Sequence, residues 1–145
     1  MDLSFQEKSA WGLLAGILVV AAFYFPRALA IVEYSGNPVA LIAISVVGVV
    51  AIVVIEVIYH ALISVAGGTA TDERDRLIDL RSERIGGFAL GIALFTIVAH
   101  VIGQTVLAGG LAPSGLLVAV YIIGALTIAE VVKLASQIWI YRTGR

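Results

Sequence analysis

Four ionisable side chains lie within long apolar stretches of the chain. Glu56 and His60 are four residues apart, and Glu130 and Lys133 are three apart. On a helix, both spacings place the two side chains on one face. An ionisable side chain at mid-bilayer costs about 2.5–3.5 kcal/mol, so each of the four is a candidate functional group. One hypothesis is a single polar cluster that carries protons, binds a cation or holds a lipid headgroup. The other is that Glu130 and Lys133 form a local structural ion pair, with Lys133 reaching toward the interface.

A second polar pair, His100 and Gln104, is predicted in the outer half of the third apolar helix. His100 and His60 should differ in depth by about 15 Å along their helices, which argues against one haem held between them. Hydrogen-bonded packing is the favoured interpretation of His100. Glu56, His60 and Glu130 have side chains that ligate metals, but their spacing matches no known metal motif. We therefore predict no metal site and no cofactor.

The segment from Asp72 to Ile85 is the most highly charged part of the chain. It contains two heptads that share Asp, Arg and Ile at their first, third and last places. At about 100° per residue, four of its acidic residues fall along one stripe of a helix, and Arg74 and Arg81 lie opposite. The four are Asp72, Asp75, Asp79 and Glu83. The segment could be a solvated helix whose arginines fix topology and contact lipid phosphates. Alternatively, its two faces could dock a partner protein or a second copy. The candidate contact residues are Arg74, Arg76, Arg81, Arg84, Asp72, Asp75, Asp79 and Glu83.

The composition of the 145 residues indicates a membrane protein. Hydrophobic residues make up 61% of the chain and charged residues 13%, and the mean hydropathy is +1.07. A soluble domain has about 25% charged residues, so this chain requires a lipid bilayer around its apolar surface. The net charge of −1 argues against nucleic-acid binding through phosphates. The absence of cysteine excludes disulfides, thiolate metal sites and cysteine nucleophiles.

The long stretches without charge predict an all-α fold, an integral membrane four-helix bundle in a single domain over residues 1–145. The stretch from Ile85 to Ala129 contains no charged residue and is too long for one crossing, which takes about 20 residues. Gly109, Gly110 and Pro113 interrupt it where a turn is needed. The predicted transmembrane helices are 10–32, 38–66, 84–108 and 114–141, with a charged helix at about 72–84 continuous with the third.

Basic residues predict the orientation of these helices. Lys8, the arginines of residues 74–84, and Arg142 and Arg145 all fall on one side, whereas Arg27 stands on the other. Because basic loops remain in the cytoplasm, both termini and the 67–83 connection should face inward. The third helix would then extend into the cytoplasm.

A faint internal repeat accompanies this pattern. Gly12 and Gly16 in the first helix align with Gly87 and Gly91 in the third. The alignment would make the fold a duplicated transmembrane hairpin, although apolar sequences also match by chance. Small residues four apart let helix backbones approach closely, either within one chain or at a dimer face.

Two stretches carry a family resemblance: Ser4 to Trp11, and the charged segment that ends at Arg84 and Ile85. They resemble a family of small, uncharacterised bacterial inner-membrane proteins, known only as predicted multi-helix membrane proteins. The resemblance implies a bacterial cytoplasmic membrane. It implies no activity and supplies no catalytic residue.

We find no signature of an enzyme: the sequence has no glycine-rich phosphate loop, no G-x-S-x-G and no H-E-x-x-H. The favoured hypothesis is a non-enzymatic membrane protein that acts as an accessory or interaction component through its charged helix. The alternative is a small oligomeric transporter or proton-linked carrier that uses the intramembrane Glu, His and Lys residues. A redox or haem membrane anchor is a weaker alternative.

Overall fold

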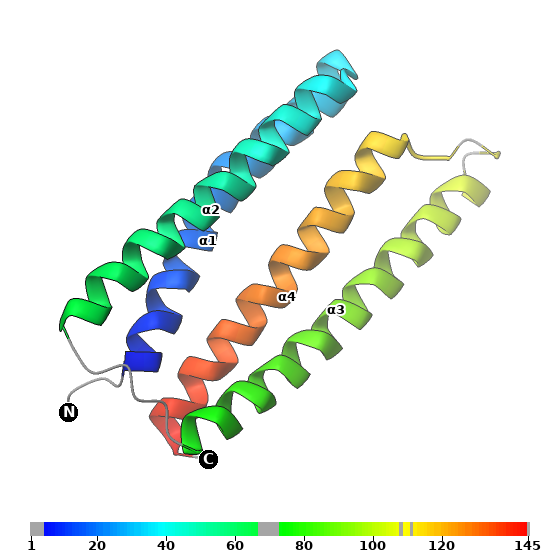
Figure 1. Ribbon diagram of the computed structural model, residues 1–145. Coiled ribbons are helices and arrows are strands. Elements are labelled where there is room, and N and C mark those ends of the chain that lie inside the picture. Colours follow the sequence, from blue (N-terminus) through cyan, green and yellow to red (C-terminus); the bar gives the residue numbers. More distant parts are fainter. Residues whose placement is uncertain (1–4, 67–72, 108, 111, 145) are drawn as a thin grey trace.

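The computed structural model of the chain describes residues 5–66, 73–107, 109–110 and 112–144. These residues form four long helices and no strand (Figure 1). A π-helical turn, η1 (Ile31–Ser35), continues the first helix to the first connection. The helices are α1 (Phe5–Ala30), α2 (Pro38–Ala66), α3 (Glu73–Leu107) and α4 (Gly115–Thr143).

All four helices of the described chain are long and apolar enough to cross a membrane, as expected of a multi-pass membrane protein. The all-helical class and the predicted number of long apolar helices are confirmed. The helix α3 contains 35 residues, which is more than the about 20 that a crossing requires. Its charged beginning and its apolar remainder form one continuous helix, as the sequence predicts.

The predicted turn between α3 and α4 is also confirmed. Gly109 and Gly110 adopt positive φ angles of 66° and 98°, a backbone conformation that favours glycine. The Ser114 hydroxyl then caps α4 by accepting a hydrogen bond from the Leu117 amide over 3.2 Å. At the first connection, the Asn37 side chain caps α2 by accepting from the Val39 amide over 3.0 Å.

The helices pack in the order α2, α1, α4, α3, so that α1 and α4 form the central pair. Figure 1 shows α1 with α2, and α3 with α4, as two hairpins. Two clusters of buried apolar side chains join the hairpins along α1 and α4, and Leu41 adds a contact from α2. The first cluster is Ala10, Ile17, Leu134 and Ile138. The second is Tyr24, Ala28, Leu41 and Val120.

Glycines bring the helices of the first hairpin together. A β-carbon on Gly12 would overlap the ring of Tyr59, and one on Gly16 would lie 2.9 Å from Cγ2 of Ile55. The Tyr59 hydroxyl also donates a hydrogen bond to the backbone oxygen of Lys8 over 2.6 Å. The first glycine pair therefore serves packing within the chain.

The second glycine pair has different surroundings. A β-carbon on Gly87 or Gly91 would meet no atom within 4 Å. The glycine that approaches α4 is Gly86, which lies against Lys133. The two pairs that align in the sequence are therefore not equivalent in their contacts.

Candidate functional site

Polar contacts gather at the end of the molecule where both chain termini lie (Figure 1). Arg142 of α4 points its Nε at Oε1 of Glu7 in α1, 3.4 Å away. Its guanidinium also lies 5.3 Å from the centre of the Trp11 ring. Glu7 is only 7% exposed, so this ion pair ties the start of α1 to the end of α4.

A seam of polar side chains joins α3 to α4 at the same end. The Tyr141 hydroxyl donates a hydrogen bond to Oδ1 of Asp75 over 2.8 Å. Further along, Nζ of Lys133 lies 3.4 Å from Oε1 of Glu130 and 4.0 Å from Oε1 of Glu83. Asp75 and Glu83 of α3 therefore each lie beside a donor group of α4, which is Tyr141 for Asp75 and Lys133 for Glu83.

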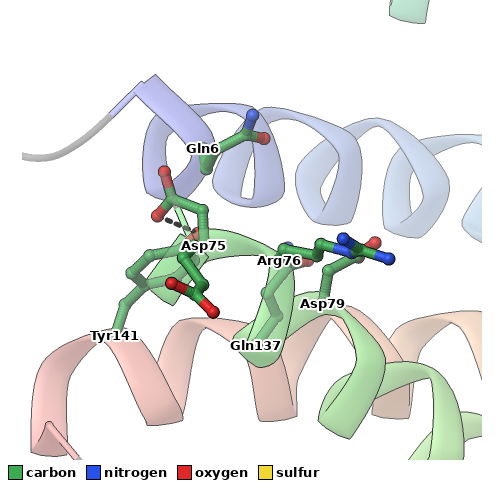
Figure 2. A pocket seen from close by; sticks show the side chains of 7 residues that line it. Gln6, Asp75, Arg76, Asp79, Gln137 and Tyr141 are labelled. Atoms are coloured by element: carbon green, nitrogen blue, oxygen red, sulfur yellow. Dashed lines mark hydrogen bonds between the residues drawn. The ribbon is translucent and has the colours of Figure 1, made fainter. Parts of the chain in front are cut away.

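A cavity of about 620 Å³ opens beside this seam, between α1, α3 and α4. Figure 2 shows the bonded pair Asp75 and Tyr141 at one part of the wall. It also shows Gln137 extending from α4 toward the side of α3 that carries Arg76 and Asp79. The residues that line the cavity are Gln6, Glu73, Asp75, Arg76, Asp79, Gln137 and Tyr141.

The lining of this cavity is predominantly acidic. Glu73, Asp75 and Asp79 supply three carboxylates against the single guanidinium of Arg76. The described residues contain no group of three or more His, Asp or Glu side chains placed to hold a metal ion.

The four intramembrane residues predicted to cluster have separate partners. Lys133 pairs with Glu130 on its own helix, in agreement with the predicted local ion pair. Nε2 of His60 lies 3.3 Å from Oγ of Ser9 in α1, and Glu56 is half-buried. Among the described residues, no hydrogen bond or ion pair joins Glu56 or His60 to the α4 pair. A functional cluster of all four stays a prediction.

The outer polar pair is exposed on α3. The His100 ring meets the Tyr121 ring edge to face, with centres 5.6 Å apart and an angle of 77° between the planes. Gln104 is exposed as well. The predicted hydrogen-bonded packing of His100 stays a prediction.

The charged segment turns its acidic stripe toward the rest of the molecule. Asp75 and Asp79 line the cavity, and Glu83 faces Lys133. Asp72 lies outside the described residues. The arginines are all exposed, and Arg74 and Arg81 border a separate hollow of about 110 Å³. The exposed arginines are Arg74, Arg76, Arg81 and Arg84.

The sequence did not single out two polar residues, Glu7 and Gln137, that are buried at the end of the molecule where the chain termini lie. Glu7 is buried although it lies near the terminus, and Gln137 is 8% exposed within an otherwise apolar helix. A signal for Gln137 was present: it lies four residues after Lys133 and four before Tyr141, which places all three on one face of α4. No comparable pattern marks Glu7.

Comparison of the chain with protein-family models, with curated proteins and with solved structures finds no match.

Proposed function

We propose that the chain is a non-enzymatic integral membrane protein that recruits an acidic partner protein through the start of α3. Its location would be the bacterial cytoplasmic membrane, with both termini and the charged segment on the cytoplasmic side, where basic residues concentrate. The supporting observation is the division of charge on α3. Asp75 and Glu83 contact side chains of α4, whereas Arg74, Arg81 and Arg84 are exposed and lie outside the cavity lining.

The exposed basic side of α3 also carries apolar side chains. Leu77 is 52% exposed and Leu80 is 53% exposed. Leu77 lies one turn from both Arg74 and Arg81 on the helix. Arginine with adjacent apolar side chains is typical of protein interfaces.

The distance of these leucines from the hydrocarbon layer favours a protein partner over lipid. Counted back from Leu107, about 20 residues of α3 cross the layer, which puts its boundary near Gly87. At about 1.5 Å per residue, Leu80 then lies about 10 Å and Leu77 about 15 Å beyond the boundary. The headgroup layer is only about 5–7 Å thick on each side, so lipid would not cover Leu77.

Site-specific photo-crosslinking in intact membranes tests this proposal. A photoreactive residue in place of Leu77 should give a discrete protein adduct that is lost in the Arg74→Glu, Arg81→Glu double variant. The same residue in place of Val46, which is exposed on the apolar surface of α2, serves as the control and should give no such adduct.

The effect of salt on the Leu77 adduct shows whether the partner is held by charge. Because an exposed electrostatic contact is screened by salt, raising the ionic strength should weaken the Leu77 adduct. An adduct that survives both the charge reversal and high salt would contradict the proposal. Absence of any protein adduct at Leu77 would contradict it as well.

A further inference from the structure

An apolar groove of about 570 Å³ lies in the membrane-spanning part of the molecule, away from the acidic cavity. Three helices line it: Phe25 comes from α1, Ala93 and Ile97 come from α3, and Tyr121 and Ala125 come from α4. Its volume falls within the range of about 300–1,000 Å³ that is typical of ligand sites, which are mostly apolar with a few polar groups.

Tyr121 supplies the available polar group of this groove. Two threonines also line it, but each donates its hydroxyl to a carbonyl of its own helix. Among the described residues, the Tyr121 hydroxyl makes no hydrogen bond, and the same is true of the His100 ring that packs against the Tyr121 ring. A phenol and an imidazole that both lack hydrogen-bond partners therefore meet at one end of the groove.

The depth of this pair makes the lack of partners significant. Tyr121 is six residues from Gly115, the first residue of α4, and His100 is seven residues from Leu107, the last of α3. At about 1.5 Å per residue, both lie about 10 Å inside the ends of their helices. The surroundings there are lipid, which cannot form hydrogen bonds, so the exposure of His100 does not satisfy its ring. A histidine at membrane depth is by default a candidate functional residue.

The same depth restricts the ligand to an uncharged head. Lipid headgroups occupy a layer of about 5–7 Å outside the hydrocarbon, so a charged phospholipid head would not reach Tyr121. The matching group is a neutral one that accepts hydrogen bonds, because the phenol and a neutral imidazole each carry one donor. From Tyr121 the groove continues to Ile128, seven residues or about 10 Å farther along α4, which provides room for an apolar tail.

We infer that the apolar groove binds an isoprenoid quinone, with Tyr121 and His100 donating hydrogen bonds to its ring oxygens. The quinone head is uncharged and flat, and the rings of Tyr121 and Phe25 can pack against it. Its isoprenoid tail matches the apolar lining toward Ile128. This site is separate from the charged segment of α3, so it does not depend on the proposed protein partner.

Photoaffinity labelling of the full chain in lipid nanodiscs tests the inference. A short-chain azido-ubiquinone should label peptides of α3 or α4 that line the groove. Excess short-chain ubiquinone should prevent the labelling in a saturable manner. Dioleoylglycerol, a neutral lipid without a quinone ring, should compete at least about tenfold less well, since it lacks the flat head that the two donors and rings contact.

Four variants test the assigned contacts. Ala93→Leu should weaken binding by at least about tenfold, because the larger side chain occupies the groove. Ala51→Leu is the matched control and should leave binding unchanged, since Ala51 lines a different apolar hollow between α1 and α2. Tyr121→Phe and His100→Phe each remove one donor and keep a ring, so each should weaken binding by about two- to tenfold.

Several results would overturn the inference. Absence of saturable labelling in the wild-type chain is one, and equal labelling of Ala93→Leu and Ala51→Leu is another, because it would indicate general partitioning into lipid. Equal competition by dioleoylglycerol would reject the quinone head. A photoreactive residue in place of Thr96 that crosslinks two copies of the chain would show that a second copy fills the groove. Thermal unfolding of each variant shows that the protein remains folded.

Discussion

Gly86 of α3 lies so close to Lys133 of α4 that a β-carbon on the glycine would stand 2.8 Å from the β-carbon of the lysine. The same β-carbon would lie 3.2 Å from the backbone oxygen of Ala129. This approach brings the two backbones together beside the ion pairs of Lys133 with Glu130 and Glu83. The close approach of the α3 and α4 backbones at Gly86 and the ion pairs of Lys133 therefore occur at the same place along the two helices.

Replacing Gly86 should disturb that approach. We expect Gly86→Leu to destabilise the protein by about 1–3 kcal/mol, because a larger side chain forces the helices apart. Thermal unfolding in detergent measures the loss. Gly87→Leu is the matched control, since a β-carbon there meets nothing within 4 Å. Equal losses at the two glycines would show that this contact is unimportant.

The two ion pairs of Lys133 should differ in strength. Double-mutant cycles that combine Lys133→Met with Glu130→Gln or Glu83→Gln should give couplings of about 0.2–1 kcal/mol, the range for partly exposed pairs. The Glu130 coupling should be the larger, because its distance is 3.4 Å rather than 4.0 Å. Chemical unfolding of the four proteins of each cycle provides the measurement, and a reversed order would count against the observed geometry.

The hydrogen bond from Tyr141 to Asp75 should contribute measurably to stability. Tyr141→Phe removes the donor and keeps the ring, so a loss of about 1 kcal/mol is expected. Tyr34→Phe provides the comparison, because Tyr34 is 80% exposed and its hydroxyl has no hydrogen bond to another described residue. A midpoint of thermal unfolding that falls equally in both variants would contradict the assigned bond.

The proposed orientation can be tested by labelling, since the chain contains no cysteine. A single cysteine at Thr143 should react with a membrane-impermeant maleimide only after the cells are opened. A cysteine at Asn37, at the other end of the molecule, should react in intact cells. The opposite pattern would place the charged segment outside the cytoplasm and remove the basis of the proposed interaction.

The helical fold follows from sequence because each signal is local. Runs without charge mark the spans, and Gly109 and Gly110 mark the second turn. The start of α1 is less well predicted: it begins at Phe5 rather than near residue 10. The polar residues there are held by α4, and Arg142 provides a partner for Glu7 that no local pattern indicates.

The candidate site was only partly predictable for a related reason. Periodicity pairs Glu130 with Lys133 and aligns the acids of α3, but it does not say which helices are neighbours. The packing order places α1 between α2 and α4. His60 therefore meets Ser9 rather than the α4 pair. Gln137 is buried beside the cavity, whose walls come from three helices, so its surroundings depend on packing that the sequence does not indicate.

The packing order has a consequence for biogenesis. Each hairpin consists of two consecutive helices whose mutual contacts involve no later part of the chain, and the α1–α4 interface joins one hairpin to the other. As the chain enters the membrane, α1 and α2 can associate before α3 has been synthesised. The cavity walls come from α1 and α4 as well as from α3, so the cavity takes shape only after α4 has been synthesised.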